Sequence, residues 1–90
     1  MKAYLISFDP YFANGQAVHN VITTSIYVND WWHYLSGTYI VISNASIHTL
    51  DNNLKSRWPD GWYILTEVKK PMIGLMSNKG WAWINERLNW

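Results

Sequence analysis

Residues 31–43 read WWHYLSGTYIVIS. Its two apolar runs, residues 31–35 and 38–43, are rich in the aromatic and β-branched side chains that favour strands. Ser36-Gly37 separates the runs, and a two-residue connection containing glycine is typical of a hairpin turn. The stretch therefore predicts a β-hairpin in the middle of the chain.

The residues before the hairpin predict one strand and one helix. Residues 3–8 alternate between two mostly apolar faces, so we expect a central strand there. Asp9-Pro10 ends it, because proline lacks a backbone donor. Apolar residues at positions 18, 21 and 22 follow helical spacing, which predicts a helix from Gln16 to about Val28. Heavy β-branching in this segment weakens the prediction of a helix.

The residues after the hairpin repeat the alternation of helix and strand. Ser46 is a suitable N-cap, and a helix should follow it because apolar residues recur at helical intervals. Those residues are Ile47, Leu50, Leu54 and Trp58. Residues 62–68 alternate as a strand, and Met72–Met76 forms a short apolar link or an extra edge strand. Ser77 is a second N-cap candidate, before a C-terminal helix with an apolar stripe. That stripe consists of Trp81, Ile84 and Leu88.

The order of these elements is β-α-β-β-α-β followed by a helix. It predicts a single α+β domain over residues 1–90, of the ferredoxin-like type with an extra C-terminal helix. In that arrangement the two main helices cover one face of the sheet. We expect a second copy, or the tail helix of a second copy, to cover the opposite face.

The composition also favours self-association. Hydrophobic residues make up 49% of the chain and charged residues 14%, against a usual charged share of about 25%. Seven Trp and six Tyr residues are too many large rings for one small core. Some must lie at an interface or in a ligand groove, and a homodimer interface is the simpler interpretation.

The charge balance and the hydropathy limit the class of protein. A formal net charge of +1 argues against strong, sequence-blind binding of nucleic acid, which depends on many phosphate contacts. The absence of cysteine excludes disulfides and cysteine-bound metals. No apolar run approaches the ~20 residues of a membrane span, and the start does not resemble a signal peptide. We therefore expect a soluble cytoplasmic protein with no membrane contact.

Four parts of the chain carry a resemblance to a known family. They are residues 4–9 (YLISFD), residues 31–35 with 38–41 (WWHYL and TYIV), the helix start at 44–54, and residues 74–76 followed by 81–84 (GLM and WAWI). The chain resembles the SinR-like family of small bacterial and phage proteins, which is similar to the Cas-two proteins of CRISPR adaptation. The resemblance covers nearly the whole chain and implies a ferredoxin-like homodimer. It implies function poorly, because fold does not imply function.

Asp9 is the candidate catalytic and metal-binding residue. In Cas-two-like proteins an acid at the end of the first strand lies near the dimer axis with a role in divalent-metal binding, and Asp9 matches that position. Two such carboxylates can hold Mg²⁺ and polarise a phosphodiester. Against this, the chain has Pro10-Tyr11-Phe12 where Cas-two-like chains carry basic residues. An Asp before Pro also commonly ends a strand and starts a turn, without any cofactor.

The hairpin supplies the candidate ligand-binding residues Trp31, Trp32, His33 and Tyr34. Exposed rings on a ferredoxin-like sheet can stack on bases, and His33 is also a candidate general acid or base. The alternative is that these side chains pack in the core or at a dimer interface. The basic residues Lys55, Arg57, Lys69 and Lys70 form the one basic grouping, which can either contact phosphate or form a solvated rim.

Two functions follow from these observations. The first is a non-catalytic dimeric binding module whose ligand is a nucleic acid, a nucleotide or a protein of a defence or anti-defence system. Abundant rings, near-neutral charge and the lack of a catalytic motif favour it. The alternative is a metal-dependent endonuclease that acts through paired Asp9 carboxylates.

Overall fold

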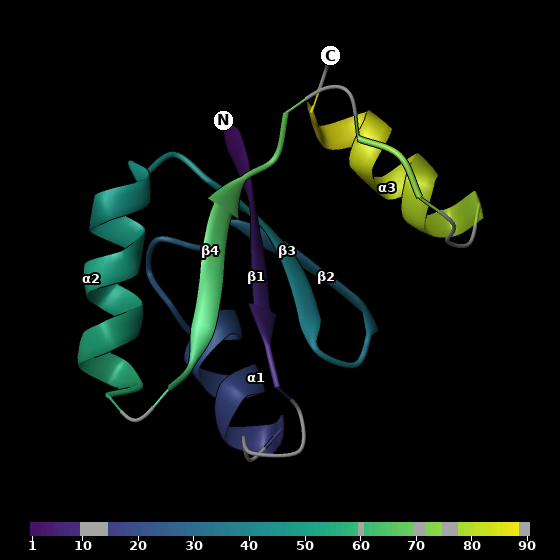
Figure 1. Ribbon diagram of the computed structural model, residues 1–90. Helices are drawn as coiled ribbons and strands as arrows, with labels where there is room; N and C mark the ends of the chain where they lie inside the picture. The colour runs from purple at the N-terminus through teal and green to yellow at the C-terminus, as the bar shows by residue number, and fades with distance from the viewer. Residues whose placement is uncertain (10–14, 60, 70–71, 75–77, 89–90) are drawn as a thin grey trace.

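The computed structural model describes residues 1–9, 15–59, 61–69, 72–74 and 78–88. Within these residues the chain forms a small α+β fold of four strands and three helices (Figure 1). In chain order they are β1 Lys2–Phe8, α1 Gly15–Thr23, β2 Asp30–Leu35, β3 Thr38–Ser43, α2 Ile47–Arg57, β4 Tyr63–Glu67 and α3 Asn78–Leu88. No helix in the described part of the chain is long and apolar enough to span a bilayer.

The four strands form one antiparallel sheet in the order β2-β3-β1-β4. The predicted hairpin is confirmed as β2 and β3, and β1 is central, as its two apolar faces predicted. This arrangement is compatible with the ferredoxin-like prediction. It leaves β4 as an edge strand of the sheet.

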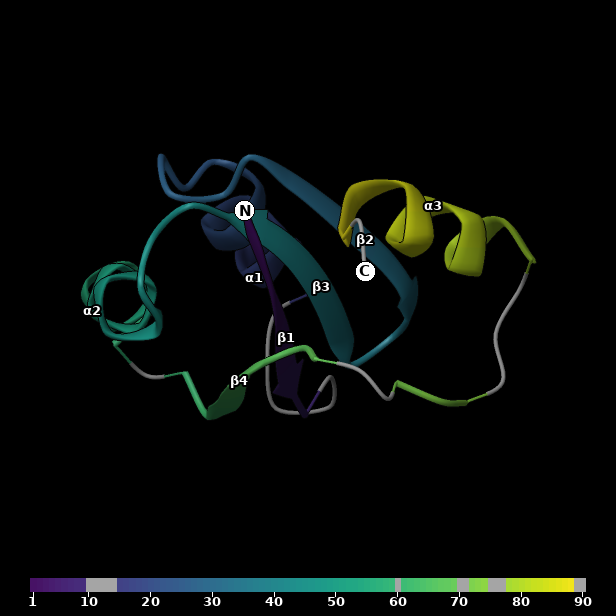
Figure 2. The same cartoon turned by 90° about the horizontal axis from the view of Figure 1, so that it is seen from above.

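One face of the sheet carries the main core, where α1 and α2 pack (Figure 2). Alternate residues of β1 point into it, since Tyr4, Ile6 and Phe8 are all buried there. The helices contribute Val18, Ile22, Leu50 and Leu54. Buried residues thus recur at every second position of β1 and at every fourth position of the helices. This pattern determines which strand residues face the helices and so fixes the sheet register.

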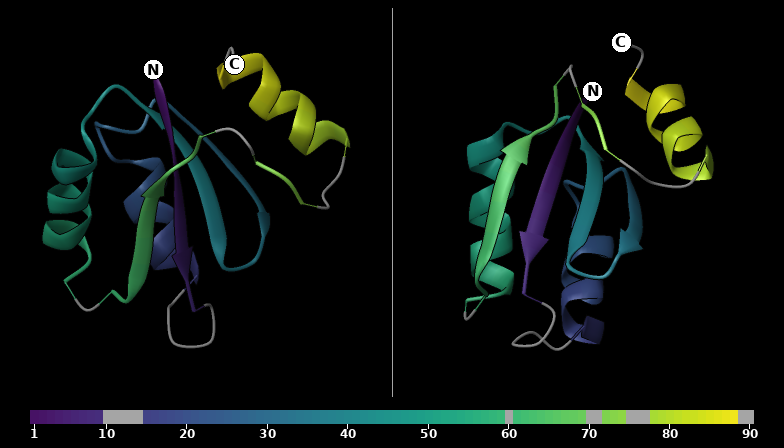
Figure 3. Two further views of the ribbon diagram at one scale, coloured as in Figure 1. Left: turned by 45° about the horizontal axis from the view of Figure 1, so that its top comes forward. Right: turned by 45° about the vertical axis from the view of Figure 1, so that its right-hand side comes forward.

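The opposite face is covered in part by α3. Ile84 is fully buried against a second cluster formed by Ala3, Trp32, Ile40 and Ile42. Arg87 on α3 also pairs with Asp30 on β2, with 2.5 Å between Nε and Oδ2. The expectation that a second copy covers this whole face is therefore corrected at its β2–β3 end, where the chain's own helix does so (Figure 3).

Two helix boundaries show how polar side chains end or start a helix. α1 ends at Thr23 instead of near Val28, and the Ser25 amide bonds three residues back to the Ile22 carbonyl. The hydroxyls of Thr23 and Thr24 donate to the carbonyls of His19 and Asn20 in the last turn, and bonds of this kind weaken a helix. The N-cap prediction for Ser46 is confirmed, since its Oγ accepts from the Thr49 amide over 3.2 Å.

The predictions for the link after β4 are only partly covered by the structure. Residues 72–74 form no strand, and residues 75–76 lie outside the described residues. Ser77, the predicted N-cap of α3, lies outside them as well. The helix itself is confirmed, beginning at Asn78.

Candidate functional site

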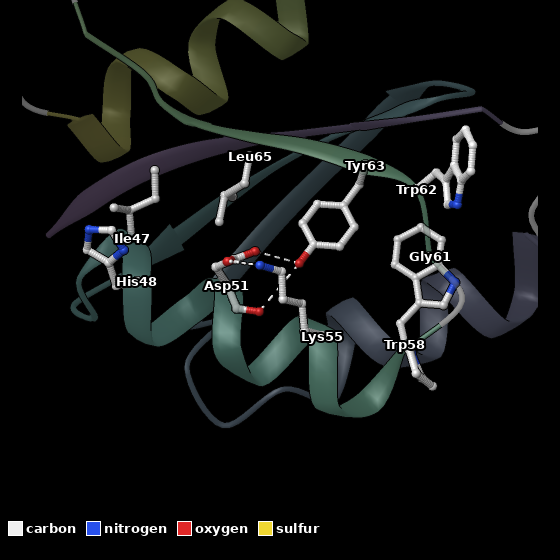
Figure 4. A pocket seen from close by; sticks show the side chains of 10 residues that line it. Ile47, His48, Asp51, Lys55, Trp58, Gly61, Trp62, Tyr63 and Leu65 are labelled. Carbon is white, nitrogen blue, oxygen red and sulfur yellow. Dashed lines mark hydrogen bonds and ion pairs between the residues drawn. The ribbon is translucent and has the colours of Figure 1, made fainter.

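A groove of about 850 Å³ runs between α2 and the edge strand β4 (Figure 4). The helix lines one side with residues at positions 47, 48, 51, 55 and 58, which share one face because they recur every three or four residues. The other side comes from β4 and the turn before it, at positions 59, 61, 62, 63 and 65. The groove therefore joins two elements that meet only in the folded chain.

Asp51 and Tyr63 form the polar centre of the groove. The Tyr63 hydroxyl donates to Asp51 Oδ1 over 2.6 Å, and Lys55 Nζ lies 2.9 Å from Asp51 Oδ2. The Tyr63 hydrogen bond, followed by Lys55, holds the pKa of Asp51 below its usual value. Burial and the neighbouring carboxylate raise the pKa of Tyr63. At neutral pH the groove thus presents a carboxylate and a protonated phenol.

Indole rings form one end of the groove. Trp58 stacks on Tyr63 with 5.5 Å between ring centroids and also meets the edge of Phe8. Trp62 is 89% exposed, so its ring is available to a ligand. Gly61 lies against the Trp58 ring, where a Cβ atom would stand 2.7 Å from Cγ. A side chain at position 61 would therefore displace Trp58.

The outer edge of β4 borders the same groove. Val68 donates to the Ala3 carbonyl over 2.8 Å, and β1–β4 pairing places Leu5 opposite Thr66. Backbone groups of an edge strand point alternately toward the sheet and away from it. Ile64 and Thr66 therefore bond to β1, while the backbone groups of Tyr63, Leu65 and Glu67 point outward. Within the described residues, the only strand paired with β4 is β1.

The predicted basic grouping does not form one positive surface. Lys55 is paired with Asp51, and Lys69 lies 3.6 Å from Glu67. The Arg57 guanidinium donates to the Val21 carbonyl on α1 over 2.7 Å and to Thr24 Oγ1 just after that helix. Lys70 lies outside the described residues. Lys55 is the member of this grouping that lines the groove.

The predicted hairpin residues lie on opposite faces of β2. Trp32 is buried beneath α3, whereas Trp31 and His33 face α1. His33 stacks on Tyr39 with 4.0 Å between centroids and bonds through Nδ1 to the Thr38 carbonyl. The side chain of Tyr34 lies outside what the structure describes. The structure thus separates Trp32 from Trp31 and His33, so these three rings do not form a single stacking platform.

Asp9 follows the last residue of β1 and is exposed. Residues 10–14, which come directly after it, lie outside the described residues. Among the residues that are described, no three His, Asp or Glu side chains gather as metal ligands. The metal site formed by two Asp9 carboxylates, one from each copy, stays a prediction.

Sequence reasoning found Lys55 but missed Asp51, Trp58, Trp62 and Tyr63 as candidate site residues. A signal was present in the run Trp58–Tyr63, where three rings flank the turn Pro59-Asp60-Gly61. Aromatic residues on both sides of a short turn come close together in space. Asp51 carried a weaker signal, because it precedes Lys55 by four positions on the predicted helix.

Comparison with known proteins assigns neither a family nor a function to the chain. No protein-family model matches the chain, and no curated protein matches it in sequence.

Proposed function

We propose that the chain is a ferredoxin-like binding module that works as a homodimer and holds a polypeptide ligand in the groove between α2 and β4. The observation that carries the proposal is the Asp51 carboxylate, bonded to Tyr63 and Lys55 in a groove with an indole wall. Protein-binding grooves commonly combine aromatic surface with a few fixed polar groups.

The charges of the groove favour a polypeptide over a nucleic acid. A strand of DNA or RNA needs a positive channel that follows its phosphates. Here each lysine near the groove faces an acid, Lys55 with Asp51 and Lys69 with Glu67. The low pKa of Asp51 keeps its negative charge in place at neutral pH, where it would repel phosphate. Peptide groups are neutral and carry no such penalty.

The aromatic end supplies binding energy that depends little on ligand charge. Trp62 can cover an apolar or aromatic side chain, while Trp58 is held in place by Tyr63 and Phe8. Contacts with a well-placed Trp frequently account for a large share of the binding energy in protein interfaces. Trp62 should therefore contribute more to affinity than any other exposed residue of the groove.

Homodimer formation is supported by the part of the sheet that α3 leaves open. Ile64 on β4 is 70% exposed, and Leu5 beside it on β1 is only half-buried. Apolar side chains gathered on a sheet face are typical of an interaction surface. This face lies opposite α2, so a copy bound there would leave the groove accessible.

Cleavage of phosphodiesters by paired Asp9 carboxylates is the rival hypothesis. It predicts that the purified protein cuts single-stranded or duplex DNA or RNA with Mg²⁺ or Mn²⁺, and that Asp9→Ala abolishes the cut. The binding-module proposal predicts no cleavage in either protein.

Selection from a random ten-residue peptide library tests the proposal. We expect the wild-type protein to enrich peptides that bind at micromolar concentration, with affinity reduced at least tenfold in Trp62→Ala. The matched control is Trp31→Ala, which removes an indole that is 39% exposed on β2, away from the groove. A labelled single-stranded DNA 20-mer is measured in parallel. Tight DNA binding at ~200 mM salt without peptide enrichment would contradict the proposal.

A further inference from the structure

The outer edge of β4 offers a row of backbone groups beside the groove. The register with β1 directs the amides and carbonyls of Tyr63, Leu65 and Glu67 away from the sheet. Unpaired strand edges are templates for another strand, and many proteins block them with proline, bulges or covering loops. β4 contains no proline, and its pairing with β1 runs without a register shift from Tyr63 to Glu67. The edge is therefore regular enough to pair along its full length.

The position of α2 limits what can occupy this edge. α2 packs against β4, on the same face of the sheet as α1 (Figure 2). Adjacent strands lie about 4.8 Å apart, whereas packed helix axes need about 8–10 Å. A second copy that joined through its own β4 would bring its own α2 into collision with this one. A single extended segment brings no helix and meets no such obstacle.

We propose that the ligand of the groove binds as a fifth strand, an extended uncharged peptide paired with the outer edge of β4 over Tyr63–Glu67. This inference rests on the proposed function and deepens it. The ligand backbone bonds to Tyr63, Leu65 and Glu67, so affinity comes largely from main-chain pairing, as in other cases of strand addition.

The two sides of the added strand would meet different chemistry. Side chains directly opposite each other on paired strands point to the same face. Ligand residues opposite Tyr63 and Leu65 therefore point toward α2, where they meet Ile47 and the Asp51 carboxylate. A carboxylate has about four acceptor positions, so Asp51 can take a further hydrogen bond. We expect a donor such as Ser, Thr or Asn in the ligand at that place.

Ligand residues opposite Ile64 and Thr66 would point to the open face of the sheet. Ile64 is exposed there, at the β4 edge of the face proposed for the second copy. A β-branched or aromatic side chain in the ligand would pack beside it. The selected peptides should thus alternate between hydrogen-bond donors and apolar residues.

Amide hydrogen exchange of the uniformly ¹⁵N-labelled full chain tests the proposal, with peptides enriched from the random library as probes. In the free protein we expect Leu65 and Glu67 amides to exchange fast, and Ile64, Thr66 and Val68 amides to exchange slowly. Saturating peptide should slow exchange at Leu65 and Glu67 at least tenfold. N-methylation of the alternate peptide amides that would pair with β4 should reduce the affinity of the peptide at least tenfold. The same peptide methylated at the intervening amides is the control.

The outcomes separate this inference from the proposed function. In one outcome, peptides bind less tightly to Trp62→Ala but do not change the amide exchange rates of Leu65 and Glu67. That outcome would overturn strand addition and leave the peptide-binding function intact. A library without any groove-dependent binder would overturn both. Slow exchange at Leu65 and Glu67 in the free protein, increasing with protein concentration, would show that a second copy occupies the edge and would overturn the proposed occupant.

Discussion

The Tyr63 hydroxyl donates to the Asp51 carboxylate over 2.6 Å and so links the edge strand β4 to α2. The two residues lie twelve positions apart in the chain and form the polar centre of the groove. Lys55 completes the arrangement one helical turn beyond Asp51. This contact keeps the two sides of the groove in fixed register, and it therefore bears on stability and on ligand binding.

Removing the hydroxyl should destabilise the fold and alter its response to acid. The pKa of Asp51 is below its unfolded value, so its stabilising contribution is present above the unfolded pKa and is lost as pH falls through the folded pKa. Tyr63→Phe should cost about 1–2 kcal/mol at pH 7. The cost should shrink below about pH 4, where Asp51 becomes protonated in the unfolded chain.

Urea unfolding at pH 7 and pH 3 measures both effects, and NMR titration of Asp51 should show its pKa rising in Tyr63→Phe. Tyr27→Phe is the control, since the described residues offer the Tyr27 hydroxyl no partner. An equal loss of stability at both pH values would show that the Asp51 charge is not involved.

Gly61→Ala should disturb the end of the groove that the indole rings form. The added Cβ would overlap the Trp58 ring, which is packed between Phe8 and Tyr63 and has little room to move. Overpacking of this kind costs about 1–3 kcal/mol, and peptide binding should weaken with it. Gly74→Ala is the matched control, because among the described residues, its chain neighbours aside, no atom lies within 4 Å of its added Cβ. Thermal unfolding and the Trp58 indole NMR signal report the change, and equal behaviour of the two variants would contradict it.

The strands and helices could be predicted from the sequence because each carries a local signal. WWHYLSGTYIVIS has a turn between two apolar runs, and Ser46 has a helical apolar pattern behind it. The end of α1 could not be predicted, because Thr23 and Thr24 follow the apolar stripe but bond back to His19 and Asn20. The apolar pattern alone does not show where side-chain hydroxyls bond to the last carbonyls of a helix and weaken its next turn.

The candidate site was harder to predict than the fold. The grouping of Lys55, Arg57 and Lys69 looked basic in sequence, but Lys55 and Lys69 each lie against a nearby acid, Asp51 and Glu67. Arg57 instead donates to the Val21 carbonyl on α1, a contact that the sequence alone did not indicate. Likewise, Trp31 and Trp32 are adjacent in sequence, yet strand alternation sends them to opposite faces of the sheet. The Asp51–Tyr63 pair exists only because α2 packs over β4.

Ile84→Ala should destabilise the fold through the second core cluster. Ile84 is fully buried against Trp32 and the β3 residues beneath α3. Removing a buried Ile side chain to Ala costs about 2–5 kcal/mol. Ile73→Ala makes the same change at a position that is 91% exposed and should cost no more than about 0.5 kcal/mol. Similar denaturant midpoints for the two variants would mean that α3 contributes little to the fold.

Ile64→Lys should weaken the proposed homodimer. The substitution places a charge on the open face beside Leu5, where burial against a second copy would be costly. Light scattering across a dilution series should show a dimer for the wild-type chain and the 10.6 kDa monomer for the variant. Ile26→Lys, at another highly exposed isoleucine outside the sheet, should remain dimeric. A monomeric wild-type chain at all concentrations would contradict the dimer.

Chemical-shift mapping shows whether the groove between α2 and β4 binds a polypeptide. A library-selected peptide is titrated into the ¹⁵N-labelled protein, and backbone and indole signals are followed. We expect the largest shift changes at Asp51, Lys55, Trp58, Trp62 and Leu65, with Trp31 and His33 unchanged. Shift changes centred on the β2–β3 hairpin, with the signals of α2 and β4 unmoved, would contradict it.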